Sequence, residues 1–129
     1  MSQNLFRNSD GSIRNILDNV EGIVFNENPL DFFIILARYK FGTRFIKKTH
    51  KVIDVGCGHG LGSVFLSKYA NEIIGVDLDK DLVETNNSNY KKIKNLQFKE
   101  FDLLKPSKSF VNEFDVVVSL DVIEHFTKR

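Results

Sequence analysis

Alternate glycines behind an apolar run are the residues of this sequence whose spacing points most directly to chemistry. Residues 52–62 read VIDVGCGHGLG, with glycine at positions 56, 58, 60 and 62. Glycine permits a positive φ angle and close approach of a ligand to the backbone, and a helix that starts after such a loop presents free N–H groups. The alternative is an ordinary strand-to-helix turn, which needs only one or two glycines. The spacing therefore predicts a ligand-binding loop.

The same spacing argues against two common phosphate-binding loops. The dinucleotide fingerprint G-x-G-x-x-G would need a glycine in place of Leu61 or Ser63. The triphosphate loop G-x-x-x-x-G-K-[ST] would need a lysine directly after a glycine, whereas the first lysine beyond the loop is Lys68. Nucleoside triphosphates are disfavoured, and an NAD-binding fragment stays open as the least favoured alternative.

The elements that must position this loop alternate between strand and helix. Short β-branched runs predict four strands, at residues 52–55, 72–76, 96–101 and 114–120. Helices are predicted between them at residues 62–69 and 80–90. Such alternation predicts an α/β fold, with a parallel sheet and helices on its faces.

The region before the first strand is predicted to be helical in part. Asn28 and Pro29 fit the start of a helix over residues 30–48, whose apolar residues nearly encircle it, so we expect much of it to be buried. Residues 1–28 are predicted to form a polar lead-in with one short helix.

Composition fits one folded unit and disfavours several partners. The 129 residues include 42% hydrophobic residues, enough for a core, and 18 Lys and Arg against 17 Asp and Glu, so no nucleic-acid partner is expected. No apolar run approaches the roughly 20 residues of a membrane span. The single Cys57 fits a reducing compartment, and we expect a cytoplasmic protein. Its three histidines and one cysteine lie at no metal-ligand spacing, which predicts no metal.

The D-x-G-x-G-x-G arrangement of Asp54, Gly56, Gly58 and Gly60 resembles motif I of the class I S-adenosylmethionine-dependent methyltransferases. In that family the second strand ends in an acidic residue that holds the ribose hydroxyls of the cofactor, and Asp77 stands at that place here. A carboxylate suits this role because it accepts from two vicinal hydroxyls at once.

Other segments extend the resemblance and imply further cofactor contacts. By resemblance Leu78 packs on the adenine ring, Asp102 with Leu103 reads the adenine, and Arg38 pairs with the cofactor carboxylate. Taken alone, Asp102 is a strand-end turn residue and Arg38 a solvated helix arginine, and both alternatives stay open. The implied cofactor-binding residues are Arg38, Asp54, Gly56, Cys57, Gly58, Gly60, Asp77, Leu78, Asp102, Leu103 and Leu120.

The fourth strand and the turn after it resemble motif IV of the small-molecule O- and C-methyltransferases. Leu120 and Asp121 fall at the carboxyl end of that strand, where open α/β sheets bind ligands. His125 is a candidate general base because imidazole titrates near neutral pH, and a helix-start histidine that packs locally is the alternative. Residues 119–122 lack the D/N/S-P-P-Y/F signature of DNA amino-methyltransferases, so DNA is not an expected target.

The resemblance implies a Rossmann-like, doubly wound parallel sheet in three α/β/α layers, of which this chain holds the N-terminal half with about four strands. Residues 29–129 would form a partial methyltransferase domain that transfers a methyl group from S-adenosylmethionine, with S-adenosylhomocysteine as product, to a small-molecule or sugar-like acceptor. The alternative is a non-catalytic module that binds the cofactor or pairs with a partner chain. The family's strand order leaves the fourth strand at an edge, so self-association through it is expected.

Overall fold

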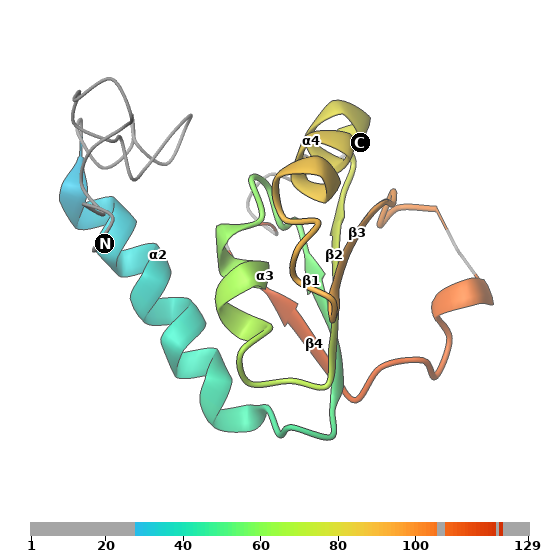
Figure 1. The fold of residues 1–129 in the computed structure, drawn as a ribbon, viewed down its shortest axis with the longest axis horizontal. Coiled ribbons are helices and arrows are strands. Elements are labelled where there is room, and N and C mark those ends of the chain that lie inside the picture. Colours follow the sequence, from blue (N-terminus) through green and yellow to red (C-terminus); the bar gives the residue numbers. More distant parts are fainter. Residues whose placement is uncertain (1–27, 106–107, 121, 123–129) are drawn as a thin grey trace, which may run out of the picture. The chain divides into compact units, whose positions relative to one another are not determined.

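Four parallel strands form one sheet, and the computed structural model describes residues 28–105, 108–120 and 122 (Figure 1). The strands are β1 (Lys51–Val55), β2 (Glu72–Asp77), β3 (Leu96–Glu100) and β4 (Val116–Ser119). Their order in the sheet is β3-β2-β1-β4, and every neighbouring pair is parallel. The predicted α/β class and the four strands are therefore confirmed, and the fourth strand lies at an edge of the sheet as the resemblance implies.

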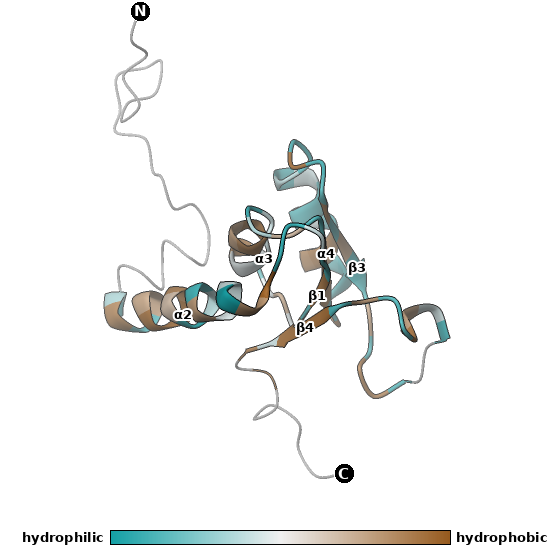
Figure 2. Ribbon diagram, turned by 90° about the horizontal axis from the view of Figure 1, so that it is seen from below, coloured by the Kyte–Doolittle hydropathy of each residue, from teal (hydrophilic) through white to brown (hydrophobic). Residues whose placement is uncertain are grey.

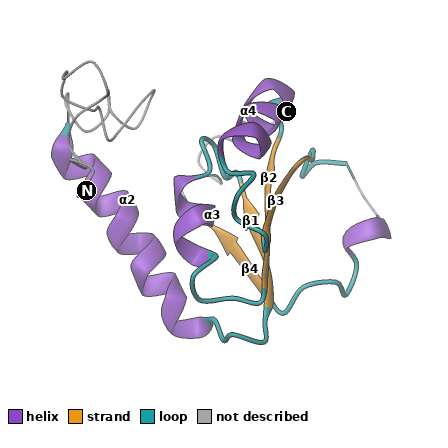
Figure 3. Ribbon diagram, viewed as in Figure 1, coloured by secondary structure: helices purple, strands orange, loops and turns teal. Residues whose placement is uncertain are grey.

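The two helices that follow the glycine loop in the sequence lie close to their predicted places. They are α3 (Leu61–Leu66) and α4 (Lys80–Asn89), each between two consecutive strands of the sheet (Figure 3). Asp79 caps α4, because its side chain accepts from the backbone N–H groups of Asp81 and Leu82. The short helix predicted within residues 1–28 lies outside the described residues.

The helix before the sheet is shorter and more exposed than predicted. It is α2 (Pro29–Gly42), followed by a 3-10 turn, η1 (Thr43–Phe45), so the predicted end at residue 48 is wrong. Glycine favours helix termination, and the Thr43 hydroxyl donates to the carbonyl of Lys40 at 2.7 Å, which competes with helical bonding. Of the α2 residues only Phe32 and Tyr39 are buried, because a helix buries only the stripe that meets a neighbour.

Two compact units divide the chain, residues 1–35 and 36–129, and the sheet belongs to the second. Within the second unit, strand alternation sends side chains to two different cores. On one face the buried residues of the strands pack with residues of α3 and α4, such as Leu66 and Val83. None of the described helices is long and apolar enough to cross a bilayer.

The second face of the sheet is covered by aromatic side chains from the segment after β3. Ile53, Val55, Ile74 and Val76 are buried there against Phe101, Phe110 and Phe114. The ring centroid of Phe110 lies 4.8 Å from that of Phe101 and 5.5 Å from that of Phe114. The segment includes a 3-10 turn, η2 (Lys108–Phe110), so in the described chain this face carries no second layer of α-helices.

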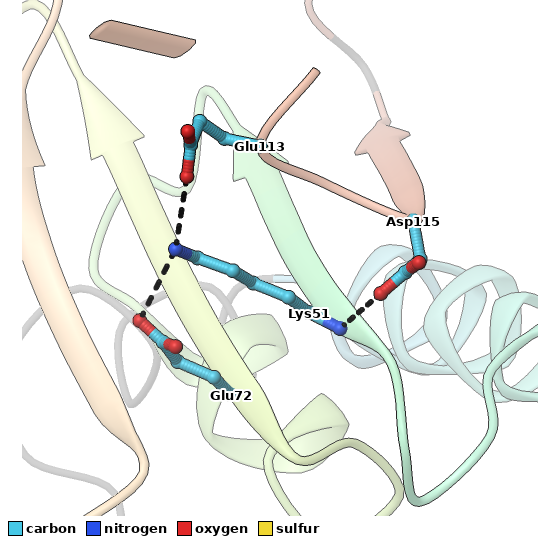
Figure 4. Close-up of polar contacts among 4 residues, drawn as sticks. All are labelled: Lys51, Glu72, Glu113 and Asp115. Atoms are coloured by element: carbon cyan, nitrogen blue, oxygen red, sulfur yellow. Dashed lines mark hydrogen bonds and ion pairs between the residues drawn. The ribbon is translucent and has the colours of Figure 1, made fainter. Parts of the chain in front are cut away.

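Ion pairs and hydrogen bonds connect the amino ends of β1, β2 and β4 (Figure 4). The backbone N–H of Lys51 donates to Asp115 Oδ2 at 2.8 Å, and the N–H of Asp115 donates back to the carbonyl of Lys51. The Nζ atom of Lys51 lies 3.6 Å from Glu113 Oε2 and 3.9 Å from Glu72 Oε1. These contacts join the amino ends of β1 and β2 to the segment that leads into β4, and the glycine loop lies at the opposite, carboxyl end of the sheet.

The two edges of the sheet differ. At the β3 edge the amide of Asn87 donates to the carbonyl of Phe98 at 2.9 Å and accepts from its N–H at 3.0 Å. The side chain thus occupies backbone groups that a further strand would use. At the other edge β4 is hydrophobic along most of its length, and Val117 is 66% exposed (Figure 2).

Candidate functional site

The glycine loop joins the carboxyl end of β1 to the start of α3, as its sequence context predicts. Gly56, Gly58 and Gly60 have φ angles of 71°, 53° and 82°, in the left-handed region that favours glycine. The N–H groups of Gly56 and Cys57 both donate to the carbonyl of Val76, at 2.8 and 3.0 Å. The loop is therefore anchored to the end of β2 and keeps one fixed path.

The glycines serve different purposes. A Cβ atom on Gly60 would lie 2.7 Å from the Phe98 ring, and one on Gly62 would lie 2.0 Å from the ring of Tyr39. These two glycines make room for aromatic side chains of the core. A Cβ on Gly58 would meet nothing within 4 Å, so the backbone at Gly58 faces open space. Gly58 is the position of the loop that a ligand can approach.

The carboxylate of Asp77 lies beside Gly58, at the carboxyl end of β2. The N–H of Gly58 donates to Asp77 Oδ2 at 3.0 Å, and the N–H of Asp79 donates to Oδ1 at 3.1 Å. Two backbone donors thus fix the plane of the carboxylate. Each oxygen retains a further lone pair, so the pair can still accept from two hydroxyl groups of a ligand. Leu78 follows directly and is 66% exposed.

Asp54 lies beneath the loop and does not reach the surface. Its exposed fraction is 0%, because strand alternation turns it toward the helix-covered face of β1. Ser63 Oγ donates to its Oδ2 at 2.6 Å, and the Tyr39 hydroxyl lies 3.3 Å from both oxygens. The carboxylate thus supports the loop by joining Tyr39, β1 and α3, and its predicted role at the cofactor stays a prediction.

Burial also raises the pKa of two acidic groups, Asp54 beneath the loop and Cys57 within it. Loss of solvent raises the pKa of Asp54 to about 6, and the hydrogen bonds from Ser63 and Tyr39 oppose that rise. Burial raises the pKa of the Cys57 thiol as well, and the carboxylates of Asp54 and Asp77 raise it further. Cys57 is consequently a buried thiol that forms part of the loop's packing, and its raised pKa disfavours the thiolate.

The remaining predicted contacts lie at the ends of β3 and β4. Asp102 Oδ1 accepts from the N–H of Leu104 at 3.0 Å, and Lys105 Nζ lies 3.4 Å from Oδ2, in the turn after β3. The predicted contact of Asp102 with the adenine stays a prediction. Leu103 is 48% exposed, and Leu120 packs partly buried against the helix-covered core.

The other predicted site residues lie on α2 or after β4. Arg38 is exposed on α2, next in sequence to the buried Tyr39. Asp121 and His125 lie outside the described residues, so the candidate general base stays a prediction. The described residues contain no group of three or more His, Cys, Asp or Glu side chains that would hold a metal ion.

Sequence reasoning missed three side chains that hold the site together. Tyr39 and Ser63 bond Asp54, and Asn86, on α4, donates through Nδ2 to the carbonyl of Gly58 at 2.7 Å. One signal was present in the sequence. Asn86 follows the apolar Val83 by three residues on a helix, which places a polar residue on the buried face. At the carboxyl ends of β1 and β2 the structure thus brings together Gly58, Asp77 and Asn86.

Known proteins match most of this region. Residues 53–129 match the family model described as a methyltransferase domain. A ubiquinone biosynthesis O-methyltransferase of Methylococcus capsulatus is 29% identical over 99 residues, which is 76% of this chain and 39% of that protein. The chain therefore spans about two fifths of the length of this curated relative.

Solved structures resemble the chain in the same way. The PH0226 protein of Pyrococcus horikoshii matches with a TM-score of 0.63 and 30% identity, over 77% of this chain and 47% of that one. PKMT2 of Rickettsia typhi, solved in complex with AdoHcy, matches with a TM-score of 0.50 and 28% identity, over 64% of this chain and 18% of that one.

Proposed function

The chain belongs to the class I S-adenosylmethionine-dependent methyltransferases, and from that membership we propose that its glycine loop binds S-adenosylmethionine. In this proposal the chain supplies the cofactor-binding half of an enzyme that methylates a small-molecule or sugar-like acceptor and releases S-adenosylhomocysteine. The solved neighbour in complex with AdoHcy supports the choice of cofactor.

One observation carries the proposal: the contact between Gly58 and Asp77. It joins an open backbone position of the loop to a carboxylate that two N–H donors hold in a fixed plane. A nucleoside offers such a site a pair of vicinal ribose hydroxyls, which the free lone pairs of one carboxylate can accept together. The donor set therefore fits the nucleoside part of the cofactor.

Neighbouring residues extend the fit to the rest of the cofactor. The exposed side chain of Leu78 offers apolar surface to the adenine ring, next to Asp77. Asp102, with Leu103, would accept from the exocyclic amine, and Arg38 would pair with the carboxylate of the methionine part. The bound cofactor would supply a methyl group on a sulfonium, ready for in-line transfer to a nucleophile.

The protein's share of such a reaction is chiefly to bind and orient. The anchored loop and the fixed Asp77 carboxylate pre-organise the ribose contacts, so little ordering remains to be done when the cofactor binds. Asp54, Ser63 and Tyr39 act below the surface by fixing the loop's path. The proposal assigns no residue of the described chain to deprotonate the acceptor.

A second candidate function, a module that pairs with a partner chain, is favoured by the edges of the sheet. Asn87 closes the β3 edge, whereas β4 presents the exposed Val117. An edge of that kind is a template for pairing. The two functions are compatible in one chain, and they respond to different substitutions.

Calorimetric titration of the 129-residue chain with S-adenosylhomocysteine tests the cofactor proposal. We expect saturable binding that Asp77→Ala abolishes or weakens at least about tenfold, since hydrogen bonds to a charged group contribute about 1.5–3 kcal/mol. Asp81→Ala, which removes an exposed carboxylate on the first turn of α4, is the matched control and should bind as the wild type does. NADH is the control ligand and should not bind.

Two results would contradict the proposal. Either a chain that is folded by circular dichroism fails to bind S-adenosylhomocysteine, or Asp77→Ala and Asp81→Ala bind it equally well. A methyl-transfer assay with the longest available reading frame then distinguishes an enzyme from a module that only binds the cofactor.

A further inference from the structure

Asn86 is a polar side chain in the core whose amide faces the glycine loop. It is 1% exposed and donates to the carbonyl of Gly58 at 2.7 Å. The helix α4 presents Val83 and Asn86 on the face that packs against the sheet. An apolar residue would be stable at such a position, whereas an amide costs free energy there unless it is hydrogen-bonded. The bond to the loop is therefore the feature that distinguishes Asn86 from a packing residue.

The two peptide groups that meet at Gly58 are both held by side chains. The N–H of Gly58 donates to Asp77, and its carbonyl accepts from Asn86. Gly58 lies in neither a helix nor a strand and has a positive φ, so no regular hydrogen-bond ladder fixes these peptide groups. Instead, Asp77 holds the N–H of Gly58 and Asn86 holds its carbonyl.

The bond from Asn86 also sets the direction of the next amide. In a trans peptide the N–H points opposite to the C=O, and the described chain has no cis peptide. With the Gly58 carbonyl turned toward α4, the N–H of His59 is turned away from it. That N–H makes no hydrogen bond to the described residues, and the space beside Gly58 is open.

We propose that Asn86 is a positioning residue of the cofactor site. By holding the Gly58 carbonyl, its amide keeps the Gly58 N–H on Asp77 and presents the N–H of His59 to the bound cofactor. The inference rests on the proposed function, because the ligand that the loop is positioned for is S-adenosylmethionine. Since Asn86 is buried behind the loop, it acts on affinity through the backbone.

Titration with S-adenosylhomocysteine across a range from about pH 8 to about pH 5 tests the role of Asn86. Asn86→Asp keeps the size of the side chain but replaces the donor with an acceptor that faces the Gly58 carbonyl. At the highest pH of this range we expect Asn86→Asp to bind S-adenosylhomocysteine about tenfold more weakly than wild type, since one net hydrogen bond is lost. As the pH falls, the introduced carboxyl takes up a proton, can donate to Gly58, and should restore affinity relative to wild type at the same pH.

Two further variants separate positioning from general destabilisation. Asn86→Ala removes the donor without adding a titratable group, so it should bind weakly at every pH and show no recovery. Asn89→Asp makes the same chemical change at an exposed position in the last turn of α4 and should bind as wild type does. A merely structural role for Asn86 would lower stability without producing a pH-dependent recovery of affinity in one variant alone.

The outcomes separate this inference from the proposed function. If wild type binds but Asn86→Asp shows wild-type affinity at the upper pH, or no recovery at the lower pH, the positioning role is overturned and the cofactor site stands. If Asn86→Asp does not fold, unchanged affinity in Asn86→Ala overturns the role. Failure of the folded wild type to bind overturns the proposed function and, with it, this inference.

Discussion

The ring of Tyr39 fills the space that a side chain on Gly62 would occupy. A Cβ atom on Gly62 would lie 2.0 Å from Cζ of that ring, whose hydroxyl in turn lies 3.3 Å from both carboxylate oxygens of Asp54. The first turn of α3 thus contains glycine because a tyrosine from the preceding helix must pass over it to reach β1. Gly62 is therefore a packing requirement, whereas the backbone at Gly58 is open to a ligand.

Gly62→Ala should destabilise the fold through this contact. Overpacking of this kind costs about 1–3 kcal/mol, and the cost should largely disappear in a Tyr39→Ala background, where the ring is absent. Urea unfolding of the two single variants and the double variant measures the coupling free energy. Gly58→Ala is the control: its strain, about 1–2 kcal/mol for a left-handed residue, should be the same in both backgrounds. Additive costs for Gly62→Ala and Tyr39→Ala would contradict the contact.

The buried Asp54 carboxyl should make stability fall as the pH rises. Its pKa is about 6 in the folded chain against 3.8 for an aspartate in water, so the folded state binds the proton more tightly. This contribution is fully present below pH 3.8 and is lost as the pH rises through about 6. The shift corresponds to a free energy on the order of 3 kcal/mol, at about 1.36 kcal/mol per pKa unit.

Other carboxyl groups also contribute to the pH dependence of stability. The measurement therefore compares wild type with Asp54→Asn, so that their contributions cancel. The free energy of unfolding of wild type minus that of Asp54→Asn should decrease across this interval, because the asparagine does not titrate. A difference that is constant with pH, or that grows as the pH rises, would show that Asp54 is not a desolvated carboxyl.

Cys57 should react slowly with thiol reagents in the folded chain. The side chain is buried, and burial together with Asp54 and Asp77 raises its pKa, so little thiolate is present. Alkylation by iodoacetamide at mildly alkaline pH should be at least about tenfold slower than in urea, since each pKa unit lowers the thiolate fraction about tenfold. Equal rates in the folded and unfolded chain would place the thiol in an accessible environment.

Self-association should proceed through β4 and not through β3. We propose this edge because Val117 is exposed there, whereas the Asn87 amide already occupies the backbone groups of Phe98 at the opposite edge. Sedimentation equilibrium should show a mass that rises with concentration, and Val117→Lys should suppress that rise. Gln97→Lys adds the same charge to the exposed β3 position and should leave it unchanged. A monomer at tens of micromolar would contradict the proposal.

The sequence alone determined the strands and the loop on which the site is built. β-branched runs, helical segments and the glycine spacing predict four parallel strands and a loop at the carboxyl end of the first, and the structure has these four strands and this loop. These features are readable because they depend on residue type and on spacing within a few positions. The position of Asp77 could be predicted in the same way, because it is the last residue of β2 and the end of a strand can be recognised from the local sequence.

Only the tertiary structure decided which side chains serve the loop and which support it. The contacts of Asp54 with Tyr39 and of Gly58 with Asn86 join residues 15 and 28 positions apart, and they form only when the Tyr39 side chain and α4 pack on one face of the sheet. The same packing buried Asp54, whose spacing in the motif is typical of a ligand contact. It also left most of α2 exposed, because a helix that is apolar on all sides can bury only the stripe that meets its neighbours.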